Sequence, residues 1–260
     1  MIWLSRLRQI FGRYSPVLAV RIATAEFASR LFTPGRTSSY SQTGEDRIIE
    51  FYLSTDKPGF YVDVGCHHPF RLSNTARLYQ RGWSGLCIDG NPQLVREFQR
   101  RRPLDNVVCA CVSDERRPMR FELHESESLS HLSDLSDLSD GSVLTVTLAD
   151  LFEEHGVPEM FGLLAIDVEG HDFAVLRSFD LRKYRPSLIL IEIHDFVLSD
   201  PASSVVVQYL AEYGYELIAY CTMNAWFRHI RDHEDSCQDP PSAKKFHDAS
   251  PDSLDVDFTQ

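Results

Sequence analysis

One stretch, residues 59–92, constrains the fold more than any other part of the 260-residue chain. It opens with an apolar, β-rich run that predicts a buried strand over residues 60–64, and Gly65 follows as a turn residue. A helix is predicted over residues 74–81, and a second apolar strand then ends on Asp89. Strand, glycine turn, helix, strand and acid in this order are typical of the first half of a nucleotide-binding α/β sheet.

The residues of the turn favour S-adenosylmethionine as the nucleotide ligand. A dinucleotide fold needs Gly-x-Gly-x-x-Gly so that pyrophosphate can approach the helix backbone, but Gly65 is followed by two histidines and a proline. S-adenosylmethionine has a ribose but no phosphate, so it needs an acid at the second strand and tolerates a bulkier turn. Asp89 can accept both ribose hydroxyls, and Asp63 and Asp89 suit a ligand that carries an ammonium and a sulfonium.

The rest of the chain continues the α/β pattern. The predicted later strands lie at residues 106–112, 119–124, 143–147, 163–166 and 186–193, and the predicted helices at 43–53, 91–102, 147–154, 172–179 and 200–213. Residues 215–221 and 225–230 form a predicted terminal hairpin. We therefore expect an α/β, Rossmann-like methyltransferase fold: a mostly parallel sheet with a C-terminal antiparallel hairpin and helices on both faces.

Polar residues follow two of the later strands, at the sheet edge that faces the ligand in such folds. Ser113 and Asp114 follow the third strand and are candidates for binding the adenine. Asp167 and Glu169 follow the fourth strand and are two residues apart, so both can point into the crevice. Paired carboxylates also occur in glycoside hydrolases, but that chemistry needs a wider separation across a sugar.

Candidates for a general base lie at the same edge. The predicted catalytic residues are His194, Glu169 and Asp167; His171 is a further candidate that equally well starts the following helix. His194 lies beside Glu192, which can fix its tautomer or raise its pKa. The alternative, that His194 only hydrogen-bonds to the end of its strand, remains open.

Four histidines invite a metal interpretation. They could gather with Asp89 or Asp167, and they are His67, His68, His171 and His194. No His-x-x-x-His or paired Cys/His spacing supports such a site, so no metal is expected.

Several motifs, in order, resemble the FkbM-type methyltransferases. They are Tyr-Ser-Gln-x-Gly-Glu-Asp (40–46), Tyr-Val-Asp-Val-Gly-x-x-x-Pro (61–69), Ser-Asn-Thr (73–75), Gly-Trp-x-Gly (82–85), Ile-Asp-x-Asn-Pro (88–92) and Ile-Asp-Val-Glu-Gly (166–170). The resemblance covers about residues 40–230 and implies a Rossmann-like S-adenosylmethionine fold and usually O-methylation. The chain departs from it at Ala165, where many members carry a lysine.

The resemblance also implies that Gln42 and Glu45 lie near the cofactor. A first-turn acid that complements the helix dipole is the alternative for Glu45. With the residues above, the predicted cofactor-binding set is Glu45, Asp63, Gly65, Asn74, Asp89, Ser113, Asp114 and Asp167.

Charge and length set the domain organisation. The net charge of -12 argues against nucleic acid as a partner, yet residues 1–36 hold six arginines and a single acid. We predict that 1–36 is a basic amphipathic helical extension, 37–231 the methyltransferase domain with a low-complexity loop at 125–141, and 232–260 an acidic disordered tail. The extension packs on the domain or on a second copy, as in a homo-oligomer, or it makes peripheral membrane contact through residues 1–32.

The location and the reaction complete the expectations. No apolar run reaches the length of a membrane span, and five of the six cysteines lie in or beside apolar strands, as buried thiols of a reducing, cytoplasmic compartment do. We expect an S-adenosylmethionine-dependent O-methyltransferase whose acceptor is a hydroxyl of a sugar, glycan or secondary metabolite. The alternatives are an NAD-dependent Rossmann oxidoreductase and a non-catalytic nucleotide-binding module.

Overall fold

The computed structural model describes residues 16–17, 19–20, 39–53, 57–122, 131–133 and 142–230. The predicted tail and almost all of the predicted N-terminal extension lie outside these residues, so both stay predictions.

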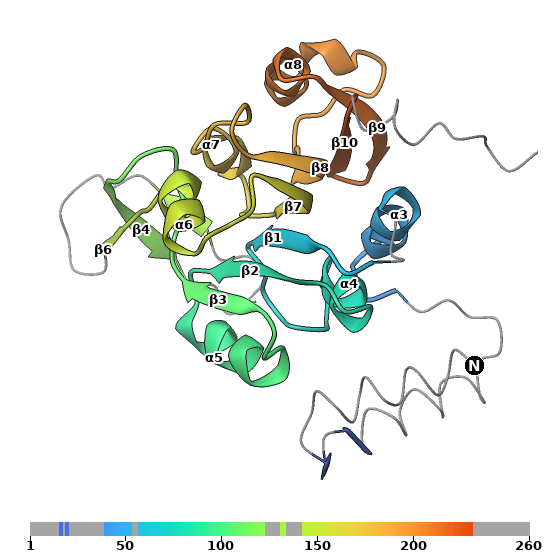
Figure 1. Ribbon diagram of the computed structural model, residues 1–260. Coiled ribbons are helices and arrows are strands. Elements are labelled where there is room, and N and C mark those ends of the chain that lie inside the picture. The colour runs from blue at the N-terminus through green and yellow to red at the C-terminus, as the bar shows by residue number, and fades with distance from the viewer. Residues whose placement is uncertain are drawn as a thin grey trace, which may run out of the picture.

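The described residues form a seven-stranded sheet with the order β3-β2-β1-β7-β8-β10-β9 (Figure 1). Its strands are β1 (Phe60–Val64), β2 (Ser84–Asp89), β3 (Asn106–Cys109), β7 (Met160–Ile166), β8 (Arg185–Glu192), β9 (Tyr215–Cys221) and β10 (Asn224–His229). The pairs from β3 to β8 are parallel, whereas β10 pairs antiparallel with both β8 and β9. The predicted parallel sheet with a terminal antiparallel hairpin is confirmed.

Helices cover both faces of this sheet, as predicted (Figure 1). On one face lie α3 (Glu45–Tyr52), α4 (Ala76–Gln80) and α5 (Pro92–Arg101), and on the other lie α6 (Leu148–Glu154), α7 (Asp172–Leu176) and α8 (Val205–Glu212). Alternate residues of a strand point to opposite faces. In β7, Leu163 packs in the core beneath the first set of helices, and Leu164 packs in the core beneath the second.

Side-chain caps begin two of the helices where the sequence places them. Asn91 accepts a hydrogen bond from the Gln93 amide at 2.9 Å before α5, and Pro92 takes the first helical position. Thr147 and Asp150 form a capping box at the start of α6. Elsewhere the bounds differ from the prediction: α4 and α7 are shorter, and the predicted helix 200–213 is a 3-10 turn (Pro201–Ser203) followed by α8.

A second, three-stranded antiparallel sheet stands beside the carboxyl end of β3. It consists of β4 (Pro118–Glu122), β5 (His131–Ser133) and β6 (Ser142–Leu144), with β4 in the centre. The prediction of a loop over 125–141 is therefore wrong for residues 131–133, which pair with β4. Backbone pairing with a neighbouring strand gives structure to three residues whose own sequence has no strand period. The remainder of 125–141 lies outside the described residues.

The cysteines fit the prediction only in part. Cys66, Cys87 and Cys111 are buried, and the thiols of all five described cysteines are free. Cys109, however, is exposed, because it ends β3 at the edge of the sheet. Burial raises the pKa of the Cys111 thiol to about 12, so the buried thiol stays protonated near neutral pH.

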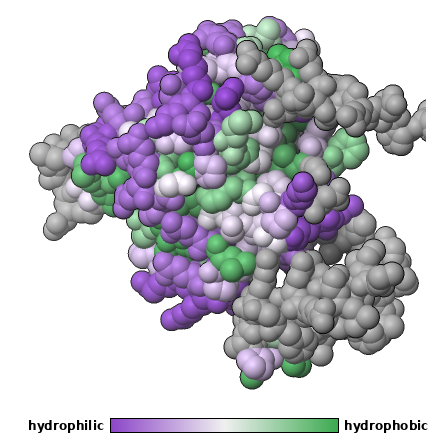
Figure 2. Space-filling view, viewed as in Figure 1, coloured by the Kyte–Doolittle hydropathy of each residue, from purple (hydrophilic) through white to green (hydrophobic). Residues whose placement is uncertain are grey.

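The surface is mixed in polarity. Figure 2 shows one face, on which hydrophilic side chains predominate toward the upper left and hydrophobic ones are interspersed across the centre. Most of the large hydrophobic side chains that are exposed belong to separate elements, among them Leu144 of β6, Met160 of β7 and Val205 of α8. Single exposed hydrophobic residues of this kind are ordinary on a folded domain. Among the described residues, no helix has the length and apolarity needed to cross a membrane.

Candidate functional site

A cavity opens at the carboxyl ends of β1, β2 and β7, where the strand order reverses between β1 and β7. In open α/β sheets this switch point is where ligands bind. The carboxylates that line the cavity are Glu45, Asp63, Asp89, Asp167 and Glu169. No lysine or arginine is among the lining residues in the described part of the chain. The cavity therefore favours a ligand with positive charge.

Gly65 forms the turn between β1 and the loop beneath the cavity. Its φ of +78° lies in the left-handed region, and a Cβ atom there would overlap the backbone carbonyl oxygen of Asp167. Its amide donates to the carbonyl of Ile88 in β2 at 2.9 Å, and the Asp167 amide donates to Val64 in β1 at 3.0 Å. The ends of three strands are thus held together around a position that only glycine fits.

Asp89 ends β2 with both carboxylate oxygens fixed. One oxygen accepts the His67 amide at 2.9 Å, and the other accepts the Asn91 amide at 2.8 Å. A carboxylate oxygen can accept more than one hydrogen bond, so each oxygen can also receive a hydroxyl of a ligand. This is the arrangement that recognition of a ribose diol needs.

Asp63 lies buried at the floor of the cavity. It accepts a hydrogen bond from the Thr75 hydroxyl at 2.5 Å. Burial raises the pKa of Asp63 above its ordinary value, although the Thr75 hydroxyl and the Arg102 guanidinium oppose the rise. A bound cation would stabilise the charged form of this carboxylate.

Beneath Asp63, the fully buried guanidinium of Arg102 ties the loop before α4 to α5. It pairs with Asp105 at 2.6 Å and donates to the hydroxyls of Tyr61 at 2.5 Å and Thr75 at 3.0 Å. It also donates to the Pro69 carbonyl at 3.2 Å. The side chain of Arg102, directly after α5, thus holds the segment containing Thr75 in place beneath the cavity.

Glu45, at the start of α3, is buried and closes another wall of the cavity. Its carboxylate accepts hydrogen bonds from the amide (2.8 Å) and hydroxyl of Thr43, and from the side-chain amide of Asn224 at 3.1 Å. Burial raises the pKa of Glu45, but the hydrogen bonds from Thr43 outweigh it and hold the pKa below the ordinary value. The sequence analysis missed Asn224, because it begins the last strand outside every motif.

The segment after β7 carries Asp167 and Glu169 into the lining, but it does so through a turn, whereas the prediction assumed that both residues continue an extended strand. Glu169 has a φ of +55°, and Asp172 holds the tight turn by accepting the amides of Val168 and Gly170, each at 3.0 Å. Burial raises the pKa of Asp172 to about 6, although the two amides oppose the rise.

The pKa of Asp167 lies well above its ordinary value. Removal from bulk water is the largest cause, followed by the negative charges of Glu192, Asp172 and Glu169. This corner of the cavity therefore concentrates negative charge.

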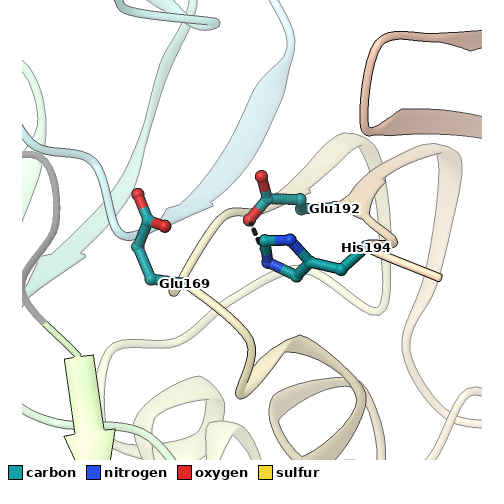
Figure 3. Close-up of side chains that lie close together, drawn as sticks. All are labelled: Glu169, Glu192 and His194. Atoms are coloured by element: carbon teal, nitrogen blue, oxygen red, sulfur yellow. Dashed lines mark ion pairs between the residues drawn. The ribbon is translucent and has the colours of Figure 1, made fainter.

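His194 reaches this corner from the end of β8 but does not itself line the cavity. Figure 3 shows its imidazole beside the carboxylate of Glu192, with Glu169 on the other side. The His194 Nε2 atom lies 3.2 Å from Glu192 Oε2. Glu192 is buried, whereas His194 is exposed.

Ser113 and Asp114, the predicted adenine contacts, are not among the cavity's lining residues. Ser113 is fully buried; its hydroxyl donates to Asp114 at 3.1 Å and lies 2.9 Å from His171 Nε2. Asp114 pairs with Arg177 at 2.7 Å. The strand β3 ends at Cys109, earlier than predicted, so these residues fall beyond the cavity.

Apolar residues line the cavity at this end instead. They are Ala110, Cys111 and Val112 after β3, with Phe121 and Leu132 from the small sheet. A mainly apolar slot of this kind suits a flat aromatic base. Phe121 and Leu132 could not be predicted as lining residues, because nothing in the local sequence indicates that the small sheet folds back to this edge.

The histidines do not gather as one metal site. The His68 Nδ1 atom accepts the amides of Phe70 and Arg71, and His171 lies against Ser113. His67 lines the cavity, together with Asn74, Gly65 and the five carboxylates Glu45, Asp63, Asp89, Asp167 and Glu169. Of the four histidines, His194 alone belongs to a cluster of three side chains with potential metal-binding atoms in the described part of the chain.

Solved structures that resemble the chain are distant in sequence. A TehB-like SAM-dependent methyltransferase from Corynebacterium glutamicum shares 15% identity, with a TM-score of 0.37, over 81% of this chain and 98% of that one. The 1,6-didemethyltoxoflavin-N1-methyltransferase of Burkholderia thailandensis, solved with bound 1,6-didemethyltoxoflavin and S-adenosylhomocysteine, shares 10% identity, with a TM-score of 0.41, over 83% and 91%.

A third structure, the precorrin-6y C5,15-methyltransferase of Geobacter metallireducens, shares 13% identity, with a TM-score of 0.35, over 74% of this chain and 92% of that one. Among proteins of curated function, none matches the chain.

The family model gives a direct assignment. The Methyltransferase FkbM domain matches residues 63–217, which is more than half of the chain and includes the end of β1 and the strands from β2 to β8. The match begins at Asp63 on the floor of the cavity and contains Gly65, Asp89, Asp167 and Glu169. The chain belongs to the FkbM methyltransferase family.

Proposed function

We propose that this S-adenosylmethionine-dependent methyltransferase transfers the methyl group to a hydroxyl oxygen of a sugar, glycan or secondary metabolite. The observation that carries the proposal is the charge of the cavity: five carboxylates and no lysine or arginine among its described lining residues. A hydroxyl is a poor nucleophile near neutral pH, so methyl transfer to it benefits from a positioned proton acceptor. Such acceptors are concentrated at the corner formed by Asp167 and Glu169.

The residues of the cavity fit the cofactor along its whole length. Asp89 presents two fixed oxygens to the ribose diol, and the apolar slot that contains Val112 and Phe121 receives the adenine. Glu45 and Asp63 lie where carboxylates would offset the positive charges of the ammonium and the sulfonium. The glycine fingerprint of a dinucleotide fold is missing, and the family assignment favours methyl transfer over the NAD-dependent alternative.

Asp167, Glu169 and His194 remain the three candidate catalytic residues. We assign Asp167 the role of accepting the proton of the acceptor hydroxyl. It lines the cavity directly, whereas His194 stands outside the lining behind Glu192. When bound, S-adenosylmethionine would supply a methyl group on a positively charged sulfur, which would keep the C–S electron pair as the methyl group is transferred. Asp167 accepts the hydroxyl proton, while the cavity walls align the acceptor.

The substitution Asp89→Asn tests the cofactor assignment. It removes the charge that strengthens the hydrogen bonds to the ribose hydroxyls, so the affinity for S-adenosylmethionine should fall about 10- to 100-fold, or about 1.4–2.8 kcal/mol. Isothermal titration calorimetry measures the change. Asp180→Asn is the matched control, because Asp180 also accepts a backbone amide, from Arg182 at 2.8 Å, on an exposed turn outside the cavity lining. Equal affinities in the two variants would refute the assignment of Asp89.

The atom that receives the methyl group is tested separately. Purified protein is incubated with isotopically labelled S-adenosylmethionine and a panel of sugars, hydroxylated metabolites and amines, and the labelled products are identified by nuclear magnetic resonance. A labelled methyl ether is the expected product, and Asp167→Asn should lower its rate of formation at least about 100-fold. Labelling only on nitrogen or carbon would refute the hydroxyl acceptor.

A further inference from the structure

We propose that Glu169, Glu192 and His194 bind a divalent metal ion beside the corner of the cavity that Asp167 and Glu169 line. One carboxylate oxygen of each glutamate and one ring nitrogen of the histidine lie within 4.8 Å of one another (Figure 3). The site itself follows from these side chains; only the role of the ion rests on the proposed function.

The first support is one carboxylate oxygen of Glu192, Oε2, which forms an ion pair with His194 but accepts no hydrogen bond from the described residues. Glu192 is 7% exposed, and its Oε2 atom is buried. The His194 Nε2 atom is only 3.2 Å away, yet the two groups are not aligned as a hydrogen bond. Two ligands of a tetrahedral ion with bonds of about 2.0–2.1 Å are about 3.3 Å apart, so this distance suits shared coordination.

A second buried oxygen that accepts no hydrogen bond from the described residues belongs to Asn224, the residue paired with Glu192 across the two strands. Asn224 lies directly opposite Glu192 in the register of β8 and β10, so the two side chains emerge on the same face. The Asn224 side-chain nitrogen donates to Glu45, which leaves its Oδ1 atom buried without a donor. Because buried polar atoms in proteins are nearly always partnered, two such oxygens on paired residues point to a missing positive or donor group.

The charge of the corner leads to the same ligand. Carboxylate oxygens of Glu169 and Glu192 lie within 4.8 Å of each other, where their negative charges repel, and no lysine or arginine is among the described residues that line the cavity. A cation held by Glu169 and Glu192 would offset this repulsion. The side chain of His194 is 44% exposed, so an ion can reach the site from solvent.

The donor set indicates the class of metal. One imidazole nitrogen and two carboxylate oxygens suit Zn²⁺ or Mn²⁺, whereas Mg²⁺ and Ca²⁺ sites are built from oxygen ligands. Three protein ligands leave coordination positions open, as in catalytic zinc sites. An acceptor hydroxyl bound there would have a lowered pKa and would release its proton to Asp167, which is outside the ligand set. Two of the ligands end β8 and the third follows β7, which is why no sequence spacing revealed the site.

Metal binding without cofactor or acceptor tests the site directly. Tag-free full-length protein is treated with EDTA, dialysed and titrated with MnCl₂ or ZnCl₂ by calorimetry, and Mn²⁺ occupancy is followed by electron paramagnetic resonance. The wild-type chain should bind one ion with micromolar or tighter affinity. Glu192→Gln and His194→Ala should each weaken this binding at least tenfold.

Glu97→Gln is the matched control. Glu97 also lies beside a histidine, with its Oε1 atom 3.6 Å from His68 Nε2, but it is on the exposed side of α5. This variant should bind the ion as the wild type does. Absence of saturable binding in the wild type, or equal affinities in wild type and His194→Ala, would overturn the metal site.

Metal affinity and S-adenosylmethionine affinity, measured on the same variants, keep this proposal separate from the proposed function. The affinity of each variant for S-adenosylmethionine, measured in EDTA, should remain within about twofold of the wild-type value, which also shows that the variant is folded. His194 is exposed, so its replacement by alanine does not threaten the fold even if Glu192→Gln does. Loss of metal binding in these variants with normal cofactor binding supports the site, whereas a failure at Asp89 bears on the cofactor assignment alone.

Discussion

Gly65 and Asp89 illustrate how single residues set the geometry of the cavity. Both were predicted from the sequence, because a turn glycine and a strand-end acid have local signatures. The close approach of Gly65 to the Asp167 carbonyl has no such signature, since it joins segments about a hundred positions apart. Asn224 was missed for the same reason: its contact with Glu45 exists only after the sheet has closed.

The substitution Gly65→Ala should lower the free energy of unfolding by about 2–5 kcal/mol. About 1–2 kcal/mol comes from an alanine in the left-handed region, and the overlap with Asp167 adds about 1–3 kcal/mol. Urea denaturation measures the change. Gly156→Ala separates the two terms, because Gly156 has a φ of +64° but no atom within 4 Å of an added Cβ. Equal decreases in the free energy of unfolding in the two variants would show that the overlap with Asp167 does not destabilise the fold.

At the scale of elements, the small sheet changes the character of the cavity. Its strand β4 brings Phe121 over Gly90 and Cys111, and β5 adds Leu132 to the lining. Hydrophobic periodicity predicted most strands of the main sheet, because each has an apolar run long enough to recognise. It could not predict β5, which has three residues in a segment rich in Ser and Asp and depends on pairing with β4.

The substitution Phe121→Ala should weaken S-adenosylmethionine binding about tenfold, because it removes an aromatic wall of the adenine slot. Calorimetry measures the affinity. Leu144→Ala serves as control, since Leu144 belongs to the same small sheet but is 64% exposed and outside the lining. An unchanged affinity in Phe121→Ala would place the adenine elsewhere in the cavity.

At the scale of the whole molecule, the sequence predicted the class of fold but only part of the site. The alternation of strands and helices indicates a parallel sheet, and the terminal hairpin indicates the methyltransferase variant. Their position after a strand predicted that Asp167 and Glu169 lie at one edge, but the turn that brings both into the lining was not predicted. Spacing along the chain could not bring Glu169 together with Glu192 and His194, because that grouping depends on the pairing of β7 with β8.

Ligand binding to the folded cavity should raise the thermal midpoint of unfolding. At a concentration of 100 times its dissociation constant, a ligand stabilises the native state by about 2.7 kcal/mol, which corresponds to about 5–10 °C for a domain of this size. S-adenosylmethionine and S-adenosylhomocysteine should give a shift in differential scanning fluorimetry, and NAD should give none. A shift with NAD as large as that with S-adenosylmethionine would contradict the cofactor assignment.

The buried Arg102 has a consequence for the order in which the molecule opens. Its guanidinium joins α5 to the segment from Pro69 to Thr75, so neither can detach without leaving a buried charge unpaired. Local opening in proteins follows such cooperative units. We therefore expect the floor of the cavity to exchange its amide hydrogens with solvent in the same cooperative unit as α5. On this expectation, a ligand meets a floor that is held in place before it binds.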